Sequence, residues 1–119
     1  MDKFKLEIIM NDTELNNKYR EIVNKLKTMK EYNTKSFEAS ESLKRNIKKQ
    51  KNIYSEELIN EYNKLEEESY KYDELFDSLW KEIFFYEIFT TTELMEYCND
   101  DLTFEDLHII LVERFHNVK

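Results

Sequence analysis

Two long series of residues, each spaced alternately by three and four positions, dominate the hydrophobic pattern of the chain. This spacing keeps one stripe of a helix facing a partner helix. The first series is polar in its middle and the second is more apolar. They consist of Leu15, Tyr19, Ile22, Leu26, Met29, Asn33, Ser36, Ser40, Leu43, Ile47, Gln50 and Tyr54, and of Leu58, Tyr62, Leu65, Ser69, Tyr72, Phe76, Leu79, Ile83 and Tyr86. We therefore expect an all-α fold with a long antiparallel helical hairpin, similar to a coiled coil.

The two predicted arms cover residues 12–54 and 55–89, because the second series does not continue the register of the first. Ser55 is placed to cap the second helix, whose first turn is acidic. Folding the arms together there would bring Gln50 near Tyr62, Ser40 near Tyr72 and Met29 near Ile83. A break near residues 33–36 is the alternative for the first arm, since its stripe is polar there.

The chain end, residues 90–119, carries two helix-start signals. Thr90 with Glu93, and Thr103 with Asp106, have capping-box spacing. They predict short helices at about 93–99 and 104–116. Their apolar residues can be buried only against the open end of the hairpin, so we expect a small C-terminal helical head within a single domain, 1–119.

Residues 1–11 leave two interpretations open. Phe4, Leu6, Ile8 and Met10 alternate with polar residues, which is a strand pattern. No second strand is visible, however, and a short helix docked on the head by Phe4 and Ile8 fits as well.

Composition excludes several classes of protein. The chain has no Gly and no Pro, so it lacks the glycines required by phosphate-binding loops and nucleophile elbows. Cys98 is the single cysteine, which rules out an intrachain disulfide and favours a buried apolar role. No apolar run approaches the roughly 20 residues that cross a bilayer, and the first residues do not resemble a signal peptide. We expect a cytoplasmic protein with no membrane association.

Two Glu-x-x-His steps, Glu105 to His108 and Glu113 to His116, resemble those of di-iron bundles. Both lie on one predicted helix, roughly 12 Å apart at 1.5 Å per residue, so one chain cannot close such a site. We expect no metal, no cofactor and no enzymatic activity.

Charge is distributed unevenly. Residues 1–54 hold 13 basic and 8 acidic side chains and residues 55–119 hold 5 and 18, so the halves carry +5 and −13. The densest acidic groups predict a surface that binds a basic partner by imitating nucleic acid. They are Glu66, Glu67, Glu68, Asp73, Glu74 and Asp77, with Asp100 and Asp101 as a second group. A residual aromatic patch, Trp80, Phe84, Phe85 and Phe89, is a second candidate partner surface.

The run Lys44, Arg45, Lys48, Lys49 and Lys51 is the one stretch suited to nucleic acid. We expect these side chains to pair instead with the glutamates after Ser55. Residues 92–116 have the outline of a degenerate helix-turn-helix unit, but Glu105, Asp106 and Glu113 would repel phosphates.

These features together favour a non-enzymatic protein that binds another protein, such as a basic nucleic-acid-binding protein. The expectation is a homodimeric regulator or inhibitor of the kind that mobile elements and phages encode. A helical DNA-binding regulator using residues 44–51 is the alternative.

Overall fold

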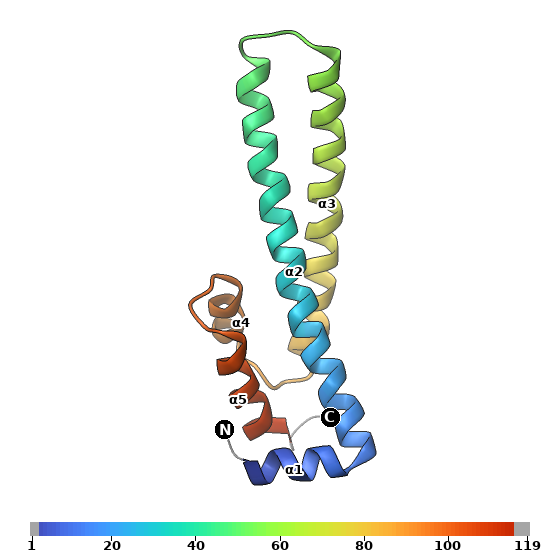
Figure 1. Ribbon diagram of the computed structural model, residues 1–119, viewed down its shortest axis with the longest axis vertical. Helices are drawn as coiled ribbons and strands as arrows, with labels where there is room; N and C mark the ends of the chain where they lie inside the picture. The colour runs from blue at the N-terminus through green and yellow to red at the C-terminus, as the bar shows by residue number, and fades with distance from the viewer. Residues whose placement is uncertain (1–2, 116–119) are drawn as a thin grey trace. The chain divides into compact units, whose positions relative to one another are not determined.

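The computed structural model describes residues 3–115, and all regular structure within them is helical. The helices are α1 (Lys3–Asn11), α2 (Thr13–Gln50), α3 (Glu56–Phe85), α4 (Thr91–Cys98) and α5 (Phe104–Arg114). Figure 1 shows α2 and α3 running in opposite directions. The predicted fold class, an all-α helical hairpin with a small C-terminal helical head, is confirmed. Of the two interpretations for the first residues, the structure has the helix, and α2 continues unbroken through 33–36.

The chain forms two compact units. The hairpin unit is Glu31–Asp77, which contains the end of α2, the connecting loop and most of α3. The head unit contains the described residues up to Lys30 and from Ser78 onward. Each unit has its own packing. Among the described residues, no helix is both long enough and apolar enough to cross a bilayer.

The hairpin unit has very little core. Ala39 and Asn46 are its buried residues. The leucines of the seam, which is the line along which α2 and α3 face each other, are half-buried, as Leu43, Leu58 and Leu65 show. The expected register placed Ile47 in the seam, and this is wrong because Ile47 is exposed. After Met29 the seam follows a strict alternation of three and four residues through Tyr32, Ser36, Ala39, Leu43, Asn46 and Gln50.

The pairing of α2 with α3 also differs from the expected one. Tyr72 lies beside Tyr32, with ring centroids 6.1 Å apart, rather than beside Ser40. Ser36 donates a short hydrogen bond to Asp73. The arms therefore pair several residues away from the expected register, because Tyr32 and Ala39 replace Asn33 and Ser40 in the seam.

Asn46 is the centre of a polar network in the hairpin seam. Its side-chain nitrogen donates to the carbonyl oxygen of Leu58 at 2.9 Å and to Oε1 of Glu61 at 3.4 Å. Gln50 donates a short hydrogen bond to its side-chain oxygen. A buried polar group must have its partners in place, so this network favours one register over its neighbours.

The head unit, in contrast, has a dense apolar core. Its side chains come from all five helices and interlock, as protein interiors do. The fully buried ones are Ile22, Leu26, Met29, Ile83, Leu94, Tyr97, Leu107, Leu111, Val112 and Phe115. α1 packs on α5 and contributes Ile9, whereas Phe4 and Ile8 are exposed. Ile9 is therefore the buried anchor of this helix, and Ile8, although exposed, lines a cavity with Val112 and Phe115 of the head.

The second arm ends earlier than residue 89. The α3 helix stops at Phe85, and Glu87 adopts a left-handed conformation with φ of 58°. Such a conformation costs a residue other than glycine on the order of 1 kcal/mol. Burial of the next two side chains, Ile88 and Phe89, offsets that cost by drawing the chain back into the head core.

The predicted helix starts are confirmed. Thr90 and Thr103 each form a complete capping box, with Glu93 and Asp106 as the returning acids. Ser55 accepts a hydrogen bond from the backbone nitrogen of Leu58 at 3.4 Å. Asp12, which the sequence pattern did not single out, caps α2 by accepting from the backbone nitrogen of Leu15.

Candidate interaction surfaces

The acidic residues expected to form one surface face several directions. Successive residues of a helix turn by about 100°, so Glu66, Glu67 and Glu68 of α3 diverge. Asp73 is bonded to Ser36, and the hydroxyl of Tyr62 is hydrogen-bonded to Glu66. The structure therefore brings Glu66, Asp73 and Asp77 onto one side of α3, and turns Glu67, Glu74 and Glu68 away from it.

The second acidic group lies in the head unit, in the turn after α4. Asp100 has a left-handed backbone with φ of 64°, and its carboxylate lies 2.5 Å from the ammonium group of Lys30. The same ammonium group lies 4.6 Å from the ring centre of Tyr97. Asp101 is exposed. Asp100 thus forms a surface ion pair within the head, and its side chain is 79% exposed.

The aromatic residues of the predicted patch are divided between surface and core. Phe85 is 84% exposed and Phe84 is also exposed. Trp80 is half-buried, and Phe89 is only 4% exposed. Phe89 therefore belongs to the head core, because the chain turns inward after Glu87. An exposed patch at this end of α3 consists of Phe84 and Phe85.

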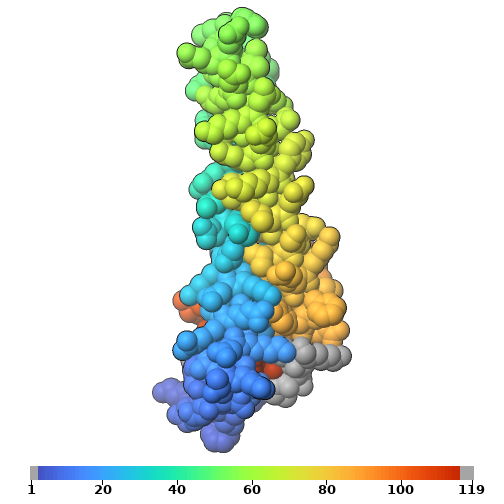
Figure 2. Space-filling view, turned by 90° about the vertical axis from the view of Figure 1, so that its right-hand side faces the viewer, coloured from blue at the N-terminus to red at the C-terminus, as the bar shows by residue number. Residues whose placement is uncertain are grey.

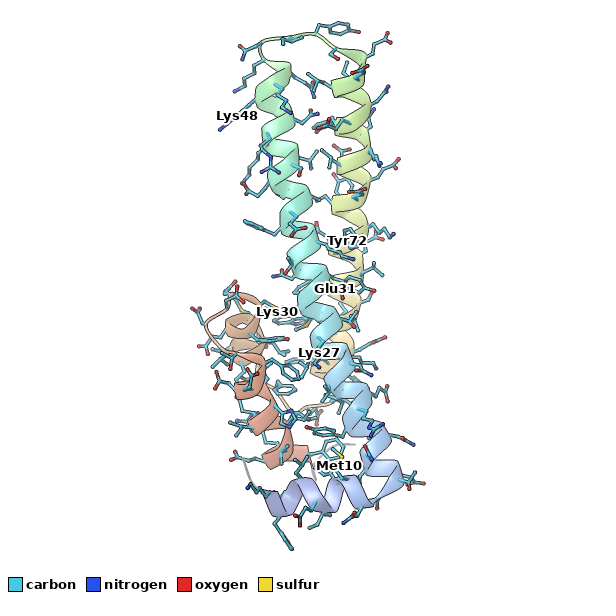
Figure 3. The ribbon with its side chains drawn as sticks, in the orientation of Figure 1. Met10, Lys27, Lys30, Glu31, Lys48 and Tyr72 are labelled. Atoms are coloured by element: carbon cyan, nitrogen blue, oxygen red, sulfur yellow. The ribbon has the colours of Figure 1, made fainter. Side chains whose placement is uncertain are left out.

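The five basic side chains of the run, Lys44, Arg45, Lys48, Lys49 and Lys51, are all exposed. Lys44 pairs with Glu41 of its own helix at 3.2 Å, and Arg45 donates to Ser42 at 3.0 Å. Within residues 3–115 no ion pair joins this run to a glutamate of α3. The expected pairing across the hairpin does not form, and the run points into solvent, as Lys48 does in Figure 3.

The large exposed apolar side chains of the two hairpin helices lie on one side, and sequence reasoning did not find this surface. On α2 the steps from Phe37 through Ser40, Lys44 and Ile47 are three or four residues, and Lys51, directly after the helix, continues them. On α3 the steps are also three or four residues, through Ile59, Tyr62, Glu66, Tyr70, Asp73 and Asp77. Each series is one stripe of its helix, next to the seam. We call the four exposed side chains the apolar face; they are Phe37, Ile47, Ile59 and Tyr70.

A shared cavity shows that these stripes border the same side of the hairpin unit. Ile47 and Lys51 of the α2 stripe line a cavity of about 380 Å³ together with Tyr62 of the α3 stripe. Ser36, a seam residue of α2, donates a hydrogen bond to Asp73 of the α3 stripe, so that stripe lies next to the seam. The opposite side carries charged and small polar residues, Glu38, Ser42, Arg45, Lys49, Glu57, Lys64, Glu68 and Lys71. The hairpin unit therefore has one apolar and one polar side.

The surface of α3 that is turned away from α2 faces the viewer in Figure 2. In the hairpin unit it carries Glu56, Asn63, Glu67 and Glu74, all exposed. The connecting loop adds Ile53 and Tyr54, which are strongly exposed and line a cavity of about 200 Å³. These surfaces are less continuous than the apolar face.

His108, the described histidine of the candidate metal pattern, packs in the head unit. The hydroxyl of Tyr19 lies 2.5 Å from its Nε2, and the ring of Phe104 stands edge-on to it at 6.0 Å. Burial, with a smaller contribution from Lys27, lowers the pKa of His108. Among the described residues no group of three His, Cys, Asp or Glu side chains could hold a metal ion; His116 lies outside them.

The surroundings of two other ionisable groups in the head unit raise their pKa values. Burial raises the pKa of Cys98 to about 11, which keeps the thiol protonated at neutral pH. Burial opposes the charge of Lys25, but hydrogen bonds with Tyr86 and Glu21 prevail and raise its pKa. Lys25 lies 2.9 Å from both partners, so this cluster ties α2 to the chain after α3 inside the head unit.

Comparisons of this chain with protein families, with characterised proteins and with solved structures returned no match.

Proposed function

We propose that this protein is a non-enzymatic interaction protein, a small regulator or inhibitor that binds another protein chain through the apolar face of its hairpin unit. The observation that carries the proposal is the contrast within that unit. Four large apolar side chains are exposed on one side, while Ala39 and Asn46 are the buried seam residues. Apolar surface gathered on one side and bordered by charge is typical of a binding surface.

The charged residues around the apolar face favour a protein partner that carries both basic and acidic side chains. Lys44 and Lys51 border it along α2, and Glu66, Asp73 and Asp77 border it along α3. A rim of this kind speeds association and selects orientation, while the central aromatic side chains contribute most of the affinity. The acidic residues that were expected to imitate nucleic acid therefore form only one edge of this surface, and basic residues form the other.

Site-specific photo-crosslinking in the native host tests the proposal. A photoreactive amino acid at Phe37 or Tyr70 should form defined crosslinked bands. Matched positions on the polar side, Glu38 and Lys64, are exposed as well and should form few. Equal crosslinking from both sides, or none from Phe37 and Tyr70, would contradict the assignment.

A second function, binding of nucleic acid through the basic run, is favoured by the exposure of all five side chains without partners on α3. Fluorescence anisotropy with a random DNA duplex tests it. Binding that weakens steeply with salt and disappears when Lys44, Arg45, Lys48 and Lys49 are changed to Gln would support this function. Absence of binding at low salt would exclude it.

A further inference from the structure

We infer that the occupant of the apolar face is the apolar face of a second copy of this chain, with α2 of each copy lying against α3 of the other. This inference rests on the proposed function, because it names the partner of the same surface. It follows from the levels of the four side chains along the hairpin, from the charges of the two helices and from the size of the face.

The apolar side chains of α2 and α3 lie level with each other in pairs. In an antiparallel hairpin, residues at the same level have residue numbers with a nearly constant sum. That sum is 104 for Asn46 with Leu58 and 109 for Ser36 with Asp73, which are hydrogen-bonded. Ile47 with Ile59 gives 106 and Phe37 with Tyr70 gives 107, so each pair is level.

A two-fold axis along the hairpin preserves these levels and exchanges the helices. Ile47 of one copy would then meet Ile59 of the other, and Phe37 would meet Tyr70. Every apolar side chain of the face gains an apolar partner, and each contact occurs twice. Such an interface closes on itself and leaves no copy of the face uncovered.

The charges of the helices favour this axis over the perpendicular one. Within the hairpin unit, residues 31–54 hold six basic and three acidic side chains, or +3, and residues 55–77 hold two and nine, or −7. An axis across the hairpin would place α3 against α3, with like charges facing each other. The axis along the hairpin places the α2 stripe, with Lys44 and Lys51, against the α3 stripe, with Glu66, Asp73 and Asp77, so opposite charges face each other in both halves.

The size of the face indicates a dimer of moderate affinity. The 18 residues of α2 from Asn33 to Gln50 give roughly 27 Å of length at 1.5 Å per residue, and two helices are about 20 Å wide. The face thus covers on the order of 500 Å² per copy, or about 1,000 Å² in total. That is at the low end of specific interfaces, so the dimer should dissociate on dilution.

Sedimentation equilibrium on the purified full chain is the first test. The mass should rise from one chain toward two with concentration. Phe37→Ser should raise the dissociation constant at least tenfold. The matched control is Ile53→Ser in the loop, since Phe37 and Ile53 are both 64% exposed, and it should leave the constant unchanged. Circular dichroism verifies that both variants remain helical.

A mixing experiment tests the arrangement. In a Cys98→Ser background, a chain with Ile47→Cys is mixed with a chain with Ile59→Cys under mild oxidation. Disulfide-linked pairs should form in the mixture at least tenfold more than in either chain alone, because position 47 lies opposite position 59. Equal yields in the mixture and in the separate chains would overturn the arrangement.

Other outcomes separate this inference from the proposed function. A chain that stays monomeric up to millimolar concentration overturns the inference. If Phe37 and Tyr70 still crosslink to a different protein in the host, the proposed function remains and its partner is that protein. If the chain dimerises and Phe37→Ser has no effect, the inference fails as well, because another surface then forms the dimer.

Discussion

The head unit and the hairpin unit use the same two helices in opposite ways. In the head, α2 contributes Ile22, Leu26 and Met29, which are completely buried against side chains of other helices. In the hairpin unit the same helix has Ala39 and Asn46 as its buried residues, and large apolar side chains such as Phe37 remain exposed. Two helices alone bury little surface. The comparison indicates that burial of apolar side chains stabilises the head more than the hairpin unit, where large apolar side chains stay at the surface.

Truncation of a leucine in each unit would sharpen this comparison most. Leu26→Ala in the head should cost about 3 kcal/mol of unfolding free energy, because the side chain is fully enclosed. Leu65→Ala in the hairpin seam should cost about 1 kcal/mol, since that side chain is half-buried. Urea unfolding followed by circular dichroism gives both values. Similar losses in the two variants would remove the distinction between the units.

Asn46 allows a test within the hairpin unit. Asn46→Ala would leave the carbonyl of Leu58 and the amide of Gln50 without their partner, at a cost of about 1 to 3 kcal/mol. The loss should be local and appear as faster amide hydrogen exchange in residues 56–65. Asn63→Ala, on the exposed side of α3, is the control and should change little. Uniform acceleration across the head would show that the units unfold together.

The smallest expected effect is a pH dependence in the head. The folded pKa of His108 is lowered by burial, so the unfolded chain takes up a proton more readily as the pH falls through its ordinary value of about 6.5. The free energy of unfolding should therefore decrease from pH 7.5 to 5.5. Glu105, which favours the protonated form, opposes this decrease in part.

Replacement of His108 separates this contribution from others. His108→Gln should reduce the decrease, because it removes the group whose pKa burial lowers. Glu21, Glu93 and Asp106 have lowered pKa values and remain ionised throughout this range. A decrease that persists undiminished in His108→Gln would show that another group carries the dependence.

The helices and their starts were predictable from the sequence because they depend on local chemistry. Thr90 with Glu93 and Thr103 with Asp106 form the expected capping boxes, and Ser55 begins α3. The end of α3 was not predictable in this way. Residues 84–89 are apolar or aromatic except for Glu87, and the left-handed turn at Glu87 forms because Ile88 and Phe89 can be buried in the head.

The candidate surface was the least predictable feature. Ile47 fits the three-and-four spacing of the seam and equally fits the neighbouring stripe with Phe37, Ser40, Lys44 and Lys51. Periodicity alone cannot choose between adjacent stripes, since they differ by one residue. The sequence did contain one signal for a second apolar stripe. A second series with the same spacing runs beside the seam of α3, through Ile59, Tyr62, Glu66 and Tyr70.

By itself the sequence determined the helical class, the position of the turn and the division of charge between the arms. These follow from spacing, caps and counting, which act over a few residues. The tertiary structure decided the register of α2 against α3, the burial of Phe89 and Asn46, and the side on which Phe37, Ile47, Ile59 and Tyr70 are exposed. Each of these depends on which side chains meet across the interface between helices, and no local pattern in the chain encodes that choice.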